Sequence, residues 1–311
     1  MTAASNARIA FQGERGAFSE EAALKLLGAD IALVPCGTFD ATFAAIREGR
    51  ADYVLAPMEN SLAGSVHRSF DLLVESGLHI VGEVIIPIAH NLIAMPGAAF
   101  EELVSVASHP VALAQCEQFF AAHPRLKRIA AEDTAGSVRD IMRAGEKKRA
   151  AIASKRAAEL YGAAILREHL EDDRENYTRF FLLAAAAEPP IHFAGGLAAD
   201  KISLVFQLAH IPGALLHALE PFARRNINVM KIESRPMHGR PWQYRFYLDL
   251  QAAASDPEII AALGELEKVV VELKVLGSYK SASYVATSQQ SPPRDLAETA
   301  RINATLHEGS Q

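Results

Sequence analysis

The feature that most constrains the fold is a regular alternation of short apolar runs and helical patterns over the first 187 residues. Apolar runs at residues 8–12, 31–34 and 53–56 are each followed by a segment whose apolar residues have helical spacing, at 19–27, 39–47 and 66–74. Strands and helices that alternate through short connections favour parallel sheets with helices on their faces.

The alternation stops at residues 78–93, where two long apolar strand patterns, 80–86 and 88–94, flank Pro87. It then resumes, with helical patterns that include 111–120 and 155–161, and continues to a last apolar strand at 180–183. Two sets of strands and helices joined by crossing strands predict two α/β lobes. A cleft between lobes is a place where small ligands tend to bind.

The C-terminal part has a different pattern. After the proline- and glycine-containing stretch AAEPPIHFAGGLAA, apolar residues alternate at 202–208 and 246–250. Helical patterns at 213–225 and 257–267 complete a β-α-β-β-α-β order, which predicts a ferredoxin-like domain. We therefore expect domains at 1–187 and 200–280, a linker at 188–199 and a disordered tail at 281–311.

Composition narrows the possible functions. Lys and Arg number 31 against 37 Asp and Glu, a net charge of −6 that argues against a nucleic-acid binder. Two cysteines exclude a disulfide framework and a zinc site built on CxxC pairs. No secretory signal and no membrane-length apolar stretch is present, so we expect a soluble, cytoplasmic protein without a membrane partner.

Common cofactor, metal and nucleophile motifs are missing. The sequence has no GxGxxG, P-loop, HExxH or GxSxG pattern, and its histidines show no metal-ligand spacing. We therefore expect neither a cofactor nor a metal.

Several expected helices instead begin with small residues and hydroxyls, in GAFSEEAAL, ENSLAGSV, SHPVALAQC and EDTAGSV. The ordinary role of such hydroxyls is helix capping, worth about 1 kcal/mol each. If several of these helix starts faced one cleft, their N–H groups and dipoles would suit a carboxylate or phosphate. The candidates are Ser19, Ser61, Ser65, Ser108 and Thr134.

Three further polar positions stand beside apolar segments. Glu59-Asn60-Ser61 follows an apolar strand and is also typical of a turn. Thr178-Arg179-Phe180 places a hydroxyl and a guanidinium directly before a strand, where an ordinary edge pair is the alternative. Gln115 lies in a helical pattern with apolar neighbours, either buried with partners or on an exposed face.

Taken in order, these stretches resemble the prephenate dehydratase family from about Arg8 to Ser278. The matching segments are GERGAFSEEAA, PMENSLAGSV, SHPVALAQC, EDTAGSV, AAIASKRAAELYG and NYTRFFLLA. Ala17 stands where many bacterial members have Thr, and Ser137 where many have another small residue. No helical mutase segment precedes Arg8, so we expect a monofunctional enzyme.

The resemblance implies a two-lobed, periplasmic-binding-protein-like (type II) catalytic domain and a hydro-lyase reaction. Prephenate would lose CO2 and water to give phenylpyruvate, on the route to phenylalanine. By the same resemblance Thr178 is the catalytic residue, acting as a positioned hydrogen-bond donor. The implied substrate-binding residues are Asn60, Ser61, Ser108, Gln115, Thr134, Arg179 and Phe180.

The small domain resembles an ACT regulatory domain through PGALLHAL and INVMKIESRP. This likeness implies feedback control by phenylalanine, bound between subunits of a homodimer or homotetramer. At Gly213 the absence of a side chain would let a ligand approach the backbone. The implied effector residues are Gly213, Ala214, Leu215, Asn228, Glu233, Ser234, Arg235 and Pro236.

Two alternatives remain. An arogenate dehydratase, or an enzyme that accepts both compounds, would share this fold and differ in one or two polar pocket residues. A non-catalytic sensor of small molecules would use the same lobed fold for capture alone.

Overall fold

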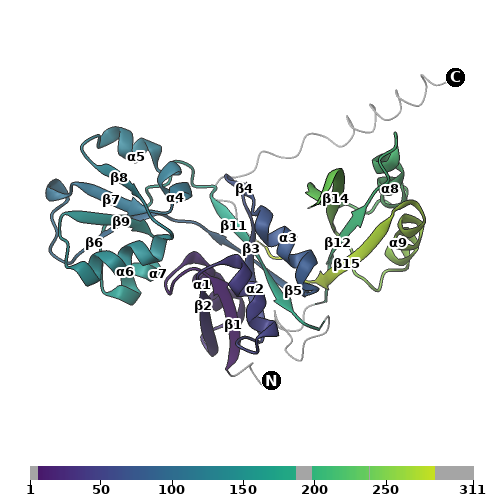
Figure 1. Ribbon diagram of the computed structural model, residues 1–311, viewed down its shortest axis with the longest axis horizontal. Coiled ribbons are helices and arrows are strands. Elements are labelled where there is room, and N and C mark those ends of the chain that lie inside the picture. Colours follow the sequence, from purple (N-terminus) through teal and green to yellow (C-terminus); the bar gives the residue numbers. More distant parts are fainter. Residues whose placement is uncertain (1–5, 187–197, 238, 284–311) are drawn as a thin grey trace.

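The computed structural model describes residues 6–186, 198–237 and 239–283. Its strands form three β-sheets (Figure 1). The first two sheets are the centres of two lobes, and the third belongs to the C-terminal domain. The linker expected at 188–199 lies almost wholly outside the described residues, and so do residues 284–311 of the expected tail.

The first lobe has the strand order β2-β1-β3-β11-β5, with the short β4 paired to β3. Strands β1, β2 and β3 are parallel, whereas β11 runs antiparallel to both of its neighbours. The elements are β1 (Ala7–Gln12), α1 (Phe18–Leu27), β2 (Ile31–Cys36), α2 (Phe39–Arg47), β3 (Tyr53–Asn60), β4 (Gly64–Ser65), α3 (His67–Ser76), β5 (His79–Pro87) and β11 (Tyr177–Ala184).

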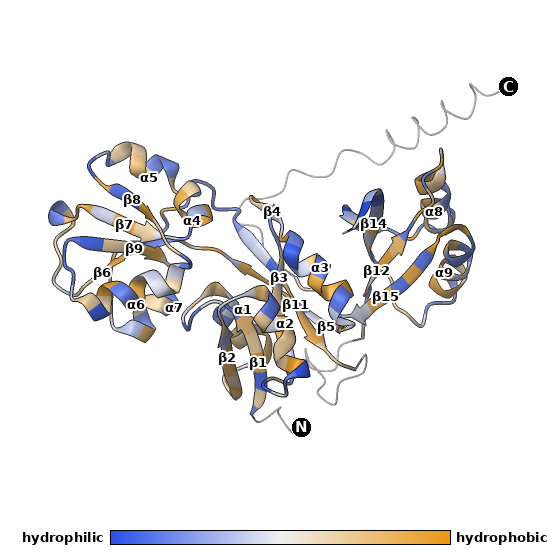
Figure 2. Ribbon diagram, viewed as in Figure 1, coloured by the Kyte–Doolittle hydropathy of each residue, from blue (hydrophilic) through white to orange (hydrophobic). Residues whose placement is uncertain are grey.

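Alternate residues bury both faces of this sheet. Ile9 and Leu55 pack with α1, and Ala10 and Val54 pack in a second cluster that includes Phe43 of α2. Burial on both faces explains the nearly continuous apolar runs of the sequence. Strand β11 is polar at its first residues and apolar beyond them (Figure 2).

The second lobe has the order β10-β6-β9-β7-β8 and connects to the first through residues 88–90 and 168–176. The two crossings confirm the predicted pair of α/β lobes. The elements are β6 (Asn91–Ala94), η1 (Phe100–Glu102), β7 (Ser105–Ser108), α4 (Pro110–Ala114), α5 (Glu117–Ala122), β8 (Lys127–Ala130), α6 (Thr134–Ala144), β9 (Arg149–Ala153), α7 (Lys155–Tyr161) and β10 (Ala164–Arg167).

The C-terminal domain is an antiparallel sheet of order β13-β14-β12-β15, with the β-α-β-β-α-β sequence of elements that the pattern predicts. One face of the sheet packs on its two helices, through residues such as Leu204, Phe206 and Leu248. The elements are β12 (Lys201–Gln207), α8 (Ala214–Ala223), β13 (Val229–Met237), β14 (Arg240–Leu250), α9 (Pro257–Val269) and β15 (Glu272–Tyr279).

The other face of this sheet docks on the first lobe. Val205, Tyr247 and Tyr279 join the same buried cluster as Ile80 and other residues of that lobe. The approach is closest at Gly277, where a Cβ would lie 2.1 Å from the carbonyl oxygen of Ile80. A larger residue at 277 would therefore force β15 away from β5.

Some boundaries differ from the sequence prediction. The helix expected at 111–120 is two helices, α4 and α5, because Asp172 accepts hydrogen bonds from the backbone N–H groups of Glu117 and Gln118. Thr178 and Arg179 lie inside β11, not before it, because pairing with β3 and β5 extends the strand to Tyr177. The patterns did not predict β4 and β10.

Within the described residues, the helices are all too short or too polar to cross a lipid bilayer.

Candidate active site

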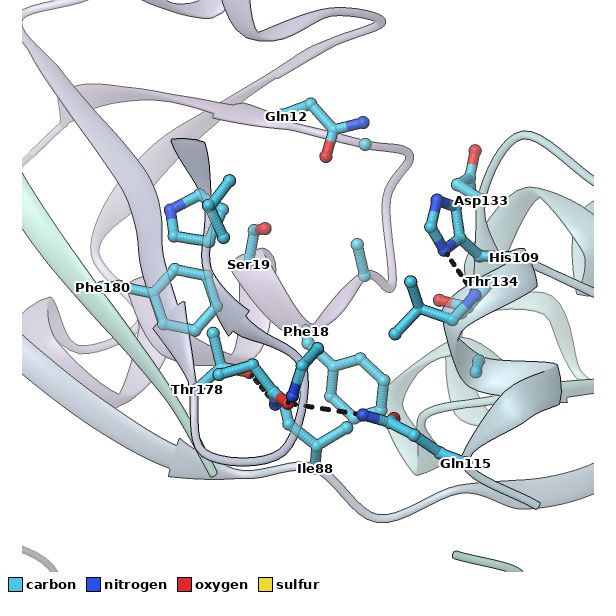
Figure 3. A pocket seen from close by; sticks show the side chains of 18 of the residues that line it. Gln12, Phe18, Ser19, Ile88, His109, Gln115, Asp133, Thr134, Thr178 and Phe180 are labelled. Carbon is cyan, nitrogen blue, oxygen red and sulfur yellow. Dashed lines mark hydrogen bonds between the residues drawn. The ribbon is translucent and has the colours of Figure 1, made fainter. Parts of the chain in front are cut away.

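A cavity of about 450 Å³ lies between the two lobes (Figure 3). The first lobe contributes Thr178 and Phe180 from β11 and Asn60 from β3. The second lobe contributes Gln115, from the break between α4 and α5, and Thr134 at the start of α6. Thr178 and Phe180 both face the cavity because side chains two residues apart lie on one side of a strand.

The beginnings of four helices line this cavity. They are represented by Phe18 of α1, Val66 before α3, His109 before α4 and Thr134 of α6. No side chain caps the first N–H groups of helices α1 and α3. The helix starts predicted to suit an anion are therefore brought to one cleft.

Asn60 connects the catalytic candidate to this cleft. Its Nδ2 group donates to Thr178 Oγ1 at 3.0 Å and to Asn176 Oδ1 at 2.7 Å. Its Oδ1 accepts from the backbone N–H groups of Leu62 and Ala63 at 3.1 and 2.8 Å. These partners define the amide orientation. Since Thr178 Oγ1 accepts the Asn60 bond, its own hydrogen remains available for donation.

Gln115 extends the same network across the lobes. Its Nε2 donates to Asn60 Oδ1 at 3.3 Å, and its Oε1 accepts from Asn176 Nδ2 at 3.1 Å. His90 Nε2 lies 2.8 Å from Gln115 Oε1, so that nitrogen carries the hydrogen. The neutral chain of amides, imidazole and hydroxyl thus joins both lobes at the base of the cleft.

Burial shapes the charge of the cleft. It lowers the pKa of His90 and of His109, which favours their neutral forms. It also raises the pKa of Asp133, although that carboxylate accepts from the N–H of Gly136 at 2.5 Å. Among the described residues that line the cavity none is Lys or Arg, and the carboxylates are Glu132 and Asp133.

Arg179 does not face the cavity, in contrast to its neighbours. Its guanidinium lies on the opposite side of β11, 2.5 Å from Asp249 of the C-terminal domain and 3.3 Å from Glu83. Its side chain is 11% exposed, and its Nη2 is 3.3 Å from Glu59 Oε2. The alternation of a strand explains this position, which is not that of a substrate contact in this conformation.

The other predicted substrate residues divide into two groups. Asn60, Gln115, Thr134 and Phe180 line the cavity with Thr178, but Ser61 and Ser108 are not among its lining residues. Ser61 Oγ donates to the Glu175 carbonyl at 2.6 Å. Ser108 Oγ is buried and donates to the Ile152 carbonyl at 2.6 Å.

The two positions noted for departing from the family pattern also differ. Ala17 lines the cavity, whereas the hydroxyl of Ser137 donates to the Asp133 carbonyl at 2.8 Å within α6.

The predicted effector residues do not share one cavity within the described chain. Ala214 and Leu215 line a hollow of about 150 Å³ beside Trp242. Gly213 precedes them with a φ of 78°, a conformation that favours glycine. Arg235 and Pro236 line a separate cavity of about 690 Å³.

The remaining effector candidates have different surroundings. Glu233 accepts from Ser65 Oγ of the first lobe at 2.8 Å. Asn228 Nδ2 donates to Gln251 Oε1 at 3.1 Å, and Ser234 is exposed on β13.

The sequence patterns did not indicate His90 and Asn176 as site residues. Both belong to the segments that cross between the lobes, and both are buried. A polar residue in an otherwise apolar crossing segment, such as His90 within IPIAHNL, is the signal that could have found them.

Comparison with known proteins supplies the family. The prephenate dehydratase family model matches residues 9–188, and the ACT domain model matches residues 202–268. Arogenate dehydratase 2 of Petunia hybrida is 44% identical, over 92% of this chain and 74% of that protein. Arogenate dehydratase/prephenate dehydratase 2, chloroplastic, of Arabidopsis thaliana is 43% identical, over 88% of this chain and 73% of that protein.

Solved structures agree with these matches. Prephenate dehydratase from Arthrobacter aurescens, in complex with L-Phe, is 30% identical with a TM-score of 0.80, covering 97% of this chain and 98% of that chain. GqqA, described as a novel type of quorum-quenching acylase, is 34% identical with a TM-score of 0.78, covering 89% and 98%. The two lobes, the cleft with its Thr-Arg-Phe strand and the matched models together show that this chain belongs to the prephenate dehydratase family of hydro-lyases and carries a C-terminal ACT domain.

Proposed function

We propose that this chain converts prephenate to phenylpyruvate by decarboxylating dehydration. The single observation that carries the proposal is the Thr178 hydroxyl in the cleft, which accepts a hydrogen bond from Asn60 and keeps its own hydrogen for a ligand. A hydroxyl polarised in this way is a better donor, because hydrogen bonds in a chain strengthen one another.

The reaction requires little from the protein beyond orientation and one donor. The bond between the ring and its carboxylate breaks and releases CO2, and the electron pair completes the aromatic ring as the ring hydroxyl departs. The prephenate dianion and one proton thus yield the phenylpyruvate anion, CO2 and water. Thr178 donates a hydrogen bond to the departing oxygen, and acid assistance of this kind typically contributes about 10²–10⁴-fold.

Binding of the dianion is assigned to helix N-termini rather than to a guanidinium. Helices α1, α3 and α6 begin at the cleft, whereas Arg179 is held by carboxylates behind β11. Orientation by backbone N–H groups and the helix dipole fits a cavity whose described lining contains no Lys or Arg.

Arogenate is the second candidate substrate, and a specific observation favours it. Its ammonium group needs an anionic or carbonyl partner, and Glu132 and Asp133 stand at the cleft. The plant relatives named above are also arogenate or arogenate/prephenate dehydratases. If arogenate is used, Glu132→Gln lowers kcat/KM for arogenate more than for prephenate.

An acylase activity, as in the description of GqqA, has weaker support. An acylase of the serine type needs a hydroxyl activated by a neighbouring base. In the described part of the cleft, neither Ser19 nor Ser65 hydrogen-bonds a histidine, and Ser65 donates to Glu233.

We also propose that phenylalanine regulates the enzyme through the ACT domain of a homodimer or homotetramer. The L-Phe complex of the Arthrobacter aurescens enzyme supports the effector. Apolar side chains on the ACT domain that one chain leaves uncovered support association; they are Ile211, Leu216, Met230, Ile232 and Trp242. Sedimentation equilibrium with and without phenylalanine measures the assembly.

The first experiment gives purified protein prephenate and then arogenate, each with and without phenylalanine, and measures the aromatic product. Prephenate turnover that falls on adding phenylalanine supports both the catalytic and the regulatory proposal. Faster turnover of arogenate than of prephenate would make arogenate the main substrate. Tight binding of either compound without any turnover overturns the proposed enzyme and favours a sensor.

A further inference from the structure

One wall of the cleft is also a contact surface for the ACT domain. This wall segment, residues 60–66, runs from the end of β3 through β4 to the start of α3, and five of its residues line the cavity. From the other side, the edge strand β13 of the ACT sheet lies against it. The segment is therefore placed between the substrate cavity and the strand that carries the ESRP motif.

Two side chains of β13 make this contact. Glu233 Oε2 accepts a hydrogen bond from Ser65 Oγ at 2.8 Å, and Lys231 Nζ donates to Glu59 Oε1 at 2.7 Å. Lys231 Nζ is also 3.6 Å from Glu233 Oε2. The side chains of Lys231 and Glu233 are only 15% and 20% exposed, so solvent weakens these contacts less than it weakens surface pairs.

The direction of Glu233 follows from the register of the sheet. Glu233 pairs with Tyr247, which packs in the cluster shared with the first lobe, and Ser234 pairs with Phe246, which packs on the helix side. Neighbouring residues of β13 therefore point in opposite directions. Glu233 faces the catalytic lobe although its motif resembles an effector-binding motif.

The contact reaches the catalytic centre by a short path. Ser65 lines the cavity itself and stands just before α3, one of the helices that begin at the cleft. Glu59 precedes Asn60, the residue that hydrogen-bonds Thr178. Glu59 is held from two sides, by Lys231 and by Arg179 at 3.3 Å.

We propose that Glu233 is a positioning residue that holds the cleft wall through Ser65, so that movement of β13 changes substrate binding. The wall segment is the element that both the ACT domain and the substrate contact. The part of this inference that concerns phenylalanine rests on the proposed function.

The test compares Glu233→Ala with Glu272→Ala, a change at an exposed glutamate of β15 that lies in the same domain and outside the effector motifs. Without effector, E233A is expected to raise KM about 3- to 10-fold, less than the loss of a whole charge-assisted hydrogen bond, because only part of that loss reaches the substrate. The change in kcat is smaller, and E272A leaves KM unchanged. Glu233→Gln restores most of the affinity, because its amide oxygen still accepts from Ser65.

Phenylalanine provides a second readout. Calorimetry is expected to show that E233A still binds phenylalanine, while activity assays show weaker inhibition, because the coupling and not the binding site is damaged. Loss of phenylalanine binding in E233A would make Glu233 an effector ligand and overturn the proposal. Equal KM values for wild type, E233A and E272A would overturn it as well.

A Ser65→Ala variant and the double variant complete a mutant cycle. Since the two residues share one hydrogen bond, their effects on KM are expected to be strongly non-additive, and additive effects contradict the proposal. Hydrogen exchange over residues 60–66 is expected to be faster in E233A than in E272A. This readout needs neither turnover nor phenylalanine, so a wild-type protein without dehydratase activity leaves the positioning role testable.

Discussion

Thr178 and Arg179 are neighbours in β11, yet they belong to two very different polar clusters. On the cleft side, Thr178 joins a neutral network of amides and an imidazole that opens onto the cavity. On the other side, Arg179 lies among Glu83, Asp249 and Lys201, a cluster with as many buried cations as anions. The first cluster keeps the Thr178 hydrogen for a ligand. In the second the charges balance, although Arg179 Nε and Nη2 are buried without a hydrogen-bond partner.

The two faces of one strand therefore have different chemistry. A network without fixed charge leaves helix N-termini to orient an anion, and in the proposed mechanism it leaves the Thr178 hydrogen for the leaving oxygen. Burying charged groups carries a desolvation penalty, which is offset only when each charge has an oppositely charged partner. Such a cluster suits an interface between domains. The ACT domain thus contacts the back of the strand whose front lines the cleft.

The largest expected effect is on kcat, when the Thr178 hydroxyl of the cleft cluster is removed. Thr178→Val keeps the shape of the side chain and removes the hydroxyl, so kcat is expected to fall about 10²–10⁴-fold. Because Asn60 keeps two other acceptors, the melting temperature changes little. Steady-state kinetics, calorimetric substrate binding and thermal melting measure these quantities, and unchanged turnover would remove Thr178 from the proposed mechanism.

Arg179→Met is expected to affect stability first. It leaves the carboxylates of Glu83 and Asp249 buried with fewer partners, and breaking a buried ion pair in this way costs about 3–5 kcal/mol. Urea unfolding measures the loss. A variant as stable as the wild type that has lost substrate affinity would instead restore the substrate contact implied by the family resemblance.

Ser108→Ala distinguishes a structural hydroxyl from a substrate contact. The change leaves the buried carbonyl of Ile152 without its 2.6 Å hydrogen bond, which is expected to cost about 1–3 kcal/mol of unfolding free energy. The kcat/KM value is expected to stay unchanged. A fall in kcat/KM without loss of stability would return Ser108 to the substrate site.

The smallest expected effect concerns pH. Burial lowers the pKa of His90 from its ordinary value of 6.5, so the unfolded chain binds a proton more readily than the folded one. The stabilisation is complete above about pH 6.5 and is lost as pH falls through the lower folded pKa, by at most about 1.4 kcal/mol per pH unit for one proton.

His90→Gln keeps a donor near Gln115 and is expected to reduce this dependence. Unfolding free energies of both proteins between pH 5 and 8 measure the difference, and His109, whose pKa burial also lowers, contributes equally to both. Identical pH profiles would show that His90 does not titrate differently on folding.

Local sequence spacing was sufficient to predict most helices and strands. It was insufficient where an element depends on a contact with a distant segment of the chain. The helices at Phe39–Arg47 and Lys155–Tyr161 have the boundaries that their spacing predicts. The helix expected at 111–120 is broken, because its cap, Asp172, lies 55 residues away from Glu117 in the chain. Strand β4 consists of two residues and depends on pairing with β3, so no periodicity could indicate it.

The same division holds for the candidate site. The residue types and their order were enough to predict two α/β lobes, a ferredoxin-like domain and helix starts suited to an anion, because these depend on local spacing. Only the tertiary structure determines that the Ser108 hydroxyl donates to a buried backbone carbonyl and that Arg179 faces the ACT domain. Register and the packing of one sheet on another set the direction of each side chain, and neither is encoded in a short stretch of sequence.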